Sequence, residues 1–202
     1  MKLRESGLPE EDYWESLFDV DLSLDRLGLD ATVGDVAELG CGYGTFTLPV
    51  ARRIGGVIET YDIEPAMVER TIQRAREAGL DNVRAEVRDV LAQGFGGAPQ
   101  TKDACLLFNI LHAEQPECLL ARAAHAVRSD GRVLVIHWRY DSATPRGPSL
   151  EIRPQPEQII EWARRTGMLR FVEPVLDLPP WHYGLRFVRI PNGRSSNGSI
   201  RS

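Results

Sequence analysis

The chain has 202 residues, of which 43% are hydrophobic and 26% charged, values typical of a single globular domain with a sizeable core. No apolar run approaches the length that a membrane-spanning helix needs. The formal net charge of −5 argues against nonspecific binding of nucleic acid, which relies on an excess of Lys and Arg.

Two short helices are expected ahead of the first strand. Residues 9–18 open with Pro and acidic side chains and carry Trp14 and Phe18 at helical spacing. Residues 22–29 form the second helix. Packing is the role expected for the aromatic side chains, and contact with a ligand through Tyr13 or Trp14 is the alternative.

A glycine-rich segment, Val-Ala-Glu-Leu-Gly-Cys-Gly-Tyr-Gly-Thr-Phe-Thr over residues 36–47, predicts a buried strand (36–39), a turn and the start of a helix near Thr45. Glycine tolerates positive φ and lacks Cβ, so the turn can pass close to a ligand. Unpaired N–H groups at the start of the helix favour an anionic or carboxylate-bearing ligand. The dinucleotide fingerprint Gly-x-Gly-x-x-Gly does not fit, because Thr45 or Thr47 stands in place of the third glycine.

Residues 57–62 predict a second strand that ends in Asp62. This carboxylate follows the glycines by about 20 residues, the spacing at which an acid binds ribose hydroxyls. The alternative is that Asp62 only caps the next helix, in which Pro65 suits the first turn and which stops at Gly79.

The later elements alternate between strands and helices. Residues 82–89 alternate apolar and polar side chains, as a third strand does, and the apolar run over residues 102–109 indicates a central parallel strand. We expect a helix over 116–128, a turn over 129–132, a buried strand over 133–139, a long connection over 140–156, a helix over 156–166 and two strands over 168–178 and 181–190. A long connection without its own structure is often a functional lid.

Two motifs carry a resemblance to a known family. The pattern Glu-x-Gly-x-Gly-x-Gly over residues 38–44 resembles motif I of the class I S-adenosylmethionine-dependent methyltransferases, and Asp-Ile-Glu-Pro over residues 62–65 resembles their motif II. The resemblance spans residues 34–190. It implies an α/β fold with a Rossmann-like, doubly wound sheet of seven strands, mostly parallel with an antiparallel last strand, and helices on both faces.

The same resemblance implies the domain organisation. Residues 1–191 are expected to form a single methyltransferase domain, in which residues 1–30 are a helical cap over the cofactor cleft. The polar residues 192–202 are expected to be a disordered tail.

Carried over position by position, the resemblance implies S-adenosylmethionine as the cofactor. Glu38 and the glycines would surround its methionine part, Asp62 would bind the ribose, and Asp89 would accept from the adenine amino group. Asn109 would offer its backbone carbonyl to the methionine amino group. The full set expected at the cofactor is Tyr13, Glu38, Gly40, Cys41, Gly42, Tyr43, Gly44, Asp62, Ile63, Asp89, Val90 and Asn109.

Transfer of a methyl group to a hydroxyl or amine calls for a base, and histidine has a suitable pKa. His112 follows the fourth strand and His137 ends the fifth, so both are expected to line the cleft as candidate catalytic residues. The alternative is that both are structural histidines. His182 and Tyr183 are a weaker candidate pair. No metal is expected, because no set of histidines and carboxylates has ligand-like spacing.

A small-molecule acceptor is expected. Three arginines, Arg139, Arg146 and Arg153, point to an anionic acceptor, and a solvated loop with scattered charge is the alternative. The sequence Asn-Ile-Leu-His over residues 109–112 departs from the motif of amino-directed nucleic-acid methyltransferases. A nucleic-acid partner is therefore not expected. A membrane partner is not expected either, because the sequence has no long apolar run.

Two other functions stay open: a nicotinamide-dependent oxidoreductase, and a non-catalytic protein that binds S-adenosylmethionine. Three cysteines without metal-ligand spacing, and a start that does not resemble a signal peptide, favour the reducing cytoplasm as the location.

Overall fold

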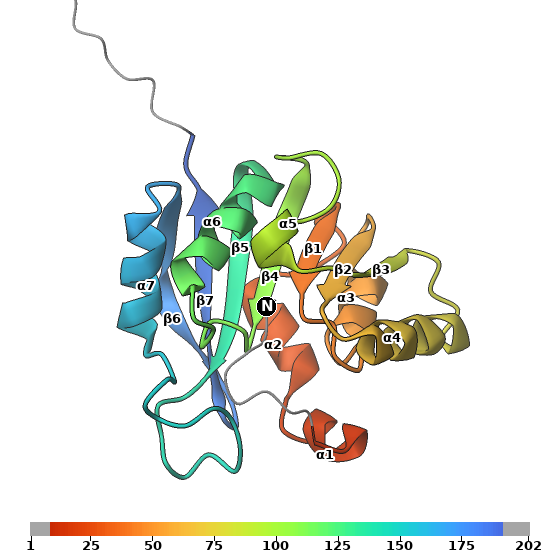
Figure 1. Ribbon diagram of the computed structural model, residues 1–202, viewed down its shortest axis with the longest axis horizontal. Helices are drawn as coiled ribbons and strands as arrows, with labels where there is room; N and C mark the ends of the chain where they lie inside the picture. The colour runs from red at the N-terminus through yellow and green to blue at the C-terminus, as the bar shows by residue number, and fades with distance from the viewer. Residues whose placement is uncertain (1–8, 192–202) are drawn as a thin grey trace, which may run out of the picture.

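A seven-stranded sheet with the strand order β3-β2-β1-β4-β5-β7-β6 forms the centre of the computed structural model, which describes residues 9–191 (Figure 1). Strand β7 pairs antiparallel with β5 and β6, and the pairs among β1 to β5 are parallel. The bounds are β1 Val36–Leu39, β2 Ile58–Asp62, β3 Val83–Val87, β4 Lys102–Phe108, β5 Val127–Trp138, β6 Leu169–Leu178 and β7 His182–Arg189. The expected fold class is confirmed.

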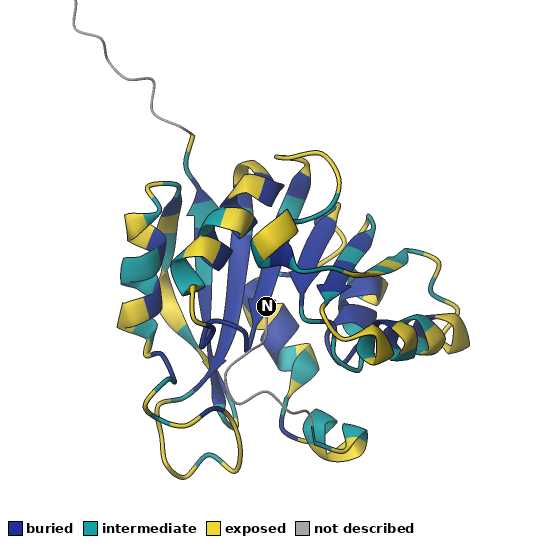
Figure 2. Ribbon diagram, viewed as in Figure 1, coloured by how far each residue is buried: buried dark blue, intermediate teal, exposed yellow. Residues whose placement is uncertain are grey.

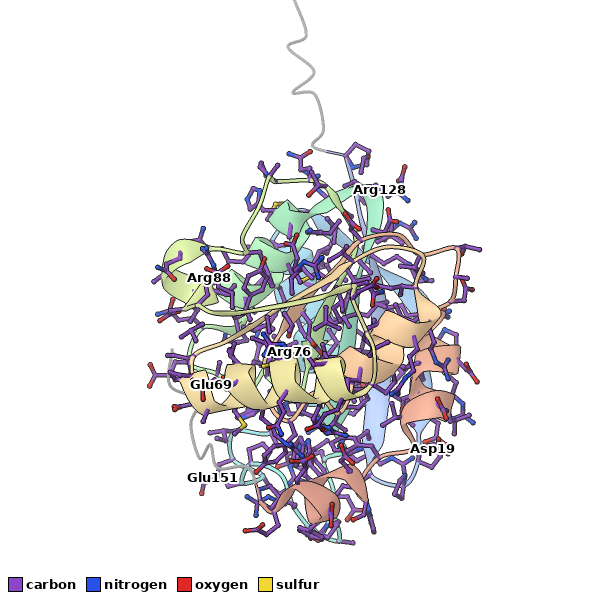
Figure 3. The ribbon with its side chains drawn as sticks, turned by 90° about the vertical axis from the view of Figure 1, so that its right-hand side faces the viewer. Asp19, Glu69, Arg76, Arg88, Arg128 and Glu151 are labelled. Atoms are coloured by element: carbon purple, nitrogen blue, oxygen red, sulfur yellow. The ribbon has the colours of Figure 1, made fainter. Side chains whose placement is uncertain are left out.

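Helices cover both faces of the sheet. One face carries α5, α6 and α7, and the other carries α2, α3 and α4 (Figure 1). The bounds are α1 Glu11–Glu15, α2 Val20–Leu27, α3 Thr47–Arg53, α4 Pro65–Glu77, α5 Val90–Gln93, α6 Pro116–Ala126 and α7 Pro156–Arg165. Figure 3 shows α4 crossing in front of the sheet, with the exposed Glu69 and Arg76 on its outer side.

The central strands are buried on both faces, as parallel strands between two helical layers must be. All four residues of β1 are buried, and so are the last five of β4 (Figure 2). Alternate residues serve different layers: Cys105 and Leu107 pack in the core with α6 and α7, whereas Leu106 and Phe108 pack in the core with α2 and α3.

The short helix α1 is joined to α4 by ion pairs. Arg70 donates two hydrogen bonds to the Glu11 carboxylate, at 2.8 and 2.9 Å, and Arg74 donates one to Glu15 at 2.6 Å. These contacts hold α1 at the end of the sheet where the parallel strands finish. The connection over residues 139–155 lies at the same end (Figure 1).

Three local expectations differ from the structure. The helix expected over residues 9–18 is shorter in the structure, where α1 covers only Glu11–Glu15. The short helix α5 was not expected. The turn expected over residues 129–132 lies inside β5, where the pairing with β4 shifts register between Val127 and Arg132. Gly131 belongs to this irregularity because a Cβ there would lie 2.8 Å from a backbone carbonyl oxygen.

The tail expected over residues 192–202, and the start of the expected cap, lie outside the described residues. Within residues 9–191, every helix is too short or too polar to cross a lipid bilayer.

Candidate functional site

A cavity of about 660 Å³ lies where the five parallel strands end. Each strand contributes the residues at or just beyond its carboxyl end: Asp89 after β3, Asp62 on β2, Gly40 after β1, Asn109 after β4 and Trp138 on β5. Open α/β sheets bind their ligands at this edge, so the cavity is the candidate site.

The glycine loop after β1 forms one wall of the cavity. Gly40, Gly42 and Gly44 have φ values of 85°, 51° and 79°, so the reason expected for glycine at these positions is confirmed. Helix α4 holds the loop from behind: Thr71 donates to the Gly42 carbonyl at 3.1 Å, and the Arg74 guanidinium donates to the Tyr43 carbonyl at 2.8 Å. These two contacts attach the backbone of the loop to α4.

Asp62 ties the tip of β2 to the glycine loop. Its Oδ2 accepts from the Gly42 N–H at 3.1 Å, and its Oδ1 accepts from the Glu64 N–H at 3.0 Å. The contact with Glu64 is the local turn that the capping alternative anticipated. Each carboxylate oxygen can still accept further hydrogen bonds, so this contact leaves capacity for ribose hydroxyls.

Glu38 lies at the bottom of the cavity with only 2% of its surface exposed. Its Oε2 accepts from the hydroxyls of Thr47, at 2.5 Å, and Thr60, at 2.8 Å. Burial raises the pKa of Glu38 to about 7, and the two hydroxyl donors only partly offset this effect. The side chain therefore changes charge near neutral pH.

Asn109 adopts a left-handed backbone conformation, with φ of 54°, immediately after β4. Its N–H donates to the Ile136 carbonyl at 2.7 Å, which fixes the backbone at this point. Neither polar atom of its buried carboxamide has a partner among the described residues. Unpartnered buried polar atoms and a strained backbone are both features of ligand sites, and both occur here at the cavity wall.

At the β3 end, Asp89 and Val90 line the cavity. The Asp89 Oδ1 accepts from the Ala92 N–H at 3.2 Å and so caps α5. Ile63, Cys41 and Tyr43 line the cavity as well. Their contact with a cofactor stays a prediction.

The two candidate catalytic histidines differ in position. His112 lines the cavity, whereas His137 is fully buried and lies behind it, with 5.6 Å between the two ring centroids. The expectation that His137 lines the cleft is not met, because side chains alternate along β5 and Trp138 is the one that faces the cavity. Burial, with His112 nearby, holds the pKa of His137 well below its ordinary value. His182 does not line the cavity: its ring stacks on Phe18 and packs against Trp138, with 4.5 and 4.2 Å between ring centroids.

Two residues of the expected cofactor set are absent from the cavity wall. Tyr13 is 44% exposed, and its neighbour Trp14 lines the cavity, because consecutive residues of a helix point about 100° apart. Gly44 faces inward instead: a Cβ there would lie 2.6 Å from Leu48 Cδ1. Its part is to shape the loop.

Of the three arginines in the connection over residues 139–155, only Arg146 lines the cavity. The Arg139 guanidinium pairs with Asp177. Arg153 is buried and donates to several groups of its own connection, among them the carbonyls of Arg139 at 3.0 Å and Pro148 at 2.6 Å. The structure therefore gives no support to the anionic-acceptor interpretation at Arg139 and Arg153, which lie outside the cavity lining and have partners within the protein.

Sequence reasoning missed three aromatic residues of the cavity wall, Phe46, Phe108 and Trp138, and offered Trp14 only as an alternative ligand contact. Phe108 and Trp138 are the last residues of their strands. An aromatic side chain at the carboxyl end of a buried strand was the signal that could have identified them.

No group of three His, Cys, Asp or Glu side chains within residues 9–191 is arranged to hold a metal ion.

A family model described as a methyltransferase domain matches residues 36–131, a little under half of the chain. Aklanonic acid methyltransferase DauC from a Streptomyces species is 37% identical over 30% of this chain and 28% of its own length. Nocamycin O-methyltransferase from Saccharothrix syringae is 31% identical over 49% of this chain and 36% of its own length.

An RNA-directed relative also matches. RlmD from Alcanivorax borkumensis, a 23S rRNA (uracil(1939)-C(5))-methyltransferase, is 41% identical over 44% of this chain and 20% of its own length. The chain thus spans well under half the length of these three relatives.

Solved structures match over nearly the whole chain. A SAM dependent methyltransferase from Aquifex aeolicus has a TM-score of 0.77 and 19% identity, over 90% of this chain and 94% of that one. Geranyl diphosphate methyltransferase in complex with SAM has a TM-score of 0.70 and 17% identity, over 91% of this chain and 93% of that one. At sequence identities below 20%, the similarity to these structures shows that the fold is shared and no more.

The glycine loop generates a prediction about stability. Gly44→Ala places a Cβ at positive φ and against Leu48, so we expect the free energy of unfolding to fall by about 2–4 kcal/mol. Gly79→Ala is the matched control: φ is 66° and no atom lies within 4 Å of the added Cβ, so only backbone strain of about 1 kcal/mol applies. Urea unfolding measures both, and equal losses would contradict the close packing at Gly44.

Glu38 generates a prediction about pH. Between pH 4.5 and about 7 the folded state retains a proton that the unfolded state has lost, so this group's contribution to stability decreases as pH rises through that range. Glu38→Gln cannot titrate and keeps an oxygen for Thr47 and Thr60. Relative to the original protein, we expect the variant to gain on the order of 3 kcal/mol across this range.

Urea unfolding at a series of pH values between 4.5 and 8 measures this gain. Burial lowers the pKa values of His137 and His182, so their contribution to the stability of the folded protein decreases as pH falls below 6.5. This slope is opposite to that of Glu38 and is common to the original protein and the Glu38→Gln variant. The difference between the two curves therefore isolates Glu38. Parallel curves would rule out an elevated pKa at this residue.

Proposed function

We propose that the protein, whose residues 36–131 match a methyltransferase-domain family model, is a class I S-adenosylmethionine-dependent methyltransferase that transfers the methyl group of S-adenosylmethionine to a small-molecule acceptor. The observation that carries the proposal is the convergence of Glu38, Asp62, Asp89 and Asn109 on one cavity at the carboxyl end of the parallel sheet. S-adenosylmethionine supplies a methyl group activated by its positively charged sulfur.

The residues present fit this cofactor. Asp62 retains acceptor capacity for ribose hydroxyls, and the buried carboxamide of Asn109 lacks partners that a ligand can provide. Glu38 is placed to compensate the methionine amino group directly or through water, and a neighbouring cation favours its ionised form. Asp89 would take the adenine amino group, with Val90 against the ring.

We further propose that α1, within the cap expected over residues 1–30, covers the cleft, whereas α2 packs on the sheet beside α3. The support is the Trp14 side chain at the cavity, together with the ion pairs that hold α1 on α4. The cap excludes water from the reacting groups, which strengthens every electrostatic interaction inside.

His112 is the candidate base. It lines the cavity next to Asn109, on the β4 side of the glycine loop, where the acceptor would approach the methyl group. There it takes the proton that a hydroxyl or amine loses as the lone pair forms the new bond to carbon, while the carbon–sulfur bond breaks. His137 is neutral behind it and supports the position of the His112 ring.

A small-molecule acceptor is favoured by the matches to aklanonic acid methyltransferase and nocamycin O-methyltransferase. Arg146 lines the cavity, and a guanidinium there would attract an anionic group on such an acceptor. The match to RlmD favours RNA as the second candidate acceptor.

Cofactor binding tests the proposal. We expect S-adenosylhomocysteine to bind in calorimetry and NAD not to bind. Asp62→Ala removes charge-assisted hydrogen bonds to the ribose, so affinity should fall about 10- to 100-fold. Asp81→Ala, a change at an exposed acid after α4, is the control and should leave affinity unchanged. NAD binding, or an affinity insensitive to Asp62, would overturn the proposed function.

Catalysis tests the role of His112. With any acceptor that turns over in a panel of small molecules and RNA, His112→Gln should lower the rate of methyl transfer by about 10²- to 10⁴-fold. The affinity for S-adenosylhomocysteine should stay within about twofold, because the change leaves the binding groups on β1 and β2 intact. His125→Gln, in α6 and away from the cavity, is the matched control. An unchanged rate in His112→Gln would remove this residue as the base.

A further inference from the structure

Four aromatic side chains from four separate elements meet at one part of the cavity. Trp14 comes from α1, Phe46 from the end of the glycine loop, Phe108 from β4 and Trp138 from β5. Phe46 and Phe108 meet edge to face with 5.0 Å between ring centroids, and Trp14 and Trp138 meet at 6.3 Å. We call this set the aromatic wall.

Two members of the aromatic wall, Phe108 and Trp138, lie on the side of the cavity away from the residues assigned to the nucleoside. Asp89 and Asp62 belong to β3 and β2, on one side of β1, whereas Phe108 and Trp138 belong to β4 and β5, on the other. A ligand with its ribose at Asp62 and its amino acid part at the glycine loop leaves this second side to the acceptor.

The connection over residues 139–155 closes this side with a wall that is already formed. Gly147, with φ of 114°, lies so close to Trp138 that a Cβ would be 2.9 Å from Cγ of the indole. Pro148 beside it is buried, and its carbonyl accepts from two nitrogens of the Arg153 guanidinium, at 3.0 and 2.6 Å. The buried Arg153 thus holds the backbone of Pro148 beside the indole.

On the basis of the proposed function, we infer that the acceptor is a flat aromatic ring system that carries its own nucleophilic hydroxyl or amine. Phe46 and Phe108 are 7% exposed and Trp138 is 1% exposed, so these rings are held in place by packing and only narrow parts of them face the cavity. A rigid aromatic surface of this kind favours a planar π-system over a puckered ring of similar size. The nucleophile would then point toward His112, which borders the same side of the cavity.

An aromatic wall can also attract an organic cation. The acids that line the cavity, Glu38, Asp62, Glu64 and Asp89, come from β1, β2 and the segments after β2 and β3, whereas Phe108 and Trp138 come from β4 and β5. The observations therefore favour the flat ring.

The experiment uses a matched pair of probes on the full chain saturated with S-adenosylhomocysteine. Naphthalen-2-ol is planar, and decahydronaphthalen-2-ol has the same carbon framework but is saturated and puckered. We expect calorimetry to show naphthalen-2-ol binding about tenfold tighter, because stacking adds to burial for the planar ring only. A generic apolar cavity would bind the saturated alcohol as well or better, since burial alone drives the binding.

Two variants connect the preference to the aromatic wall. Phe46→Leu removes one ring, and Gly147→Ala pushes a methyl group toward the Trp138 indole; both should reduce the preference at least about threefold. Phe171→Leu, which changes an aromatic residue packed on Phe187 away from the cavity, is the control and should retain it. S-adenosylhomocysteine affinity, measured alongside, shows that each variant is folded.

The outcomes separate this inference from the proposed function. If S-adenosylhomocysteine binds and the two alcohols bind equally, or if tetramethylammonium binds and naphthalen-2-ol does not, the flat-ring inference is overturned and the proposed function stands. If S-adenosylhomocysteine does not bind, the proposed function fails first and this inference fails with it.

Discussion

The hydrogen bond between the Asp62 carboxylate and the Gly42 N–H joins the tip of β2 to the loop after β1, and the floor of the cavity depends on it. Only glycine accommodates the positive φ that turns this N–H toward the carboxylate without strain. Helix α4 secures the same loop through Thr71 and Arg74. Two strands, one loop and one helix are thereby fixed relative to one another at the place where the ligand groups converge.

Charge inside the cavity is arranged around one buried carboxyl group. Glu38 is surrounded by hydroxyl donors and apolar side chains, which leaves its pKa near neutrality. A cationic group at the glycine loop would favour its ionised form, so binding and ionisation at this residue are linked. The Asp62 carboxylate is instead held in position by backbone N–H groups that donate to both of its oxygens.

The opposite side of the cavity has a different construction. Its walls are aromatic rings from elements far apart in the chain, and a buried guanidinium holds the connection that closes it. Arg153 shows how charge can mislead when only the sequence is known: an arginine in a polar loop suggested an anionic ligand, yet its donors are taken by main-chain carbonyls. Burial distinguishes the two roles.

The sequence alone determined the alternation of strands and helices, the glycine loop and the acid at the end of β2, because these depend on periodicity, residue type and spacing along the chain, which are local properties. The Rossmann-like sheet of seven strands was implied by the resemblance to a known family. Tertiary structure decided which of two neighbouring residues faces the cavity. In one pair it is Trp14 and not Tyr13, and in the other it is Trp138 and not the buried His137. It also decided that Arg146 alone, among three arginines after β5, reaches the cavity. Those choices depend on the orientation of a short helix, the register of β5 and the path of a long connection. Contacts between distant segments set all three, and no pattern within a single segment records them.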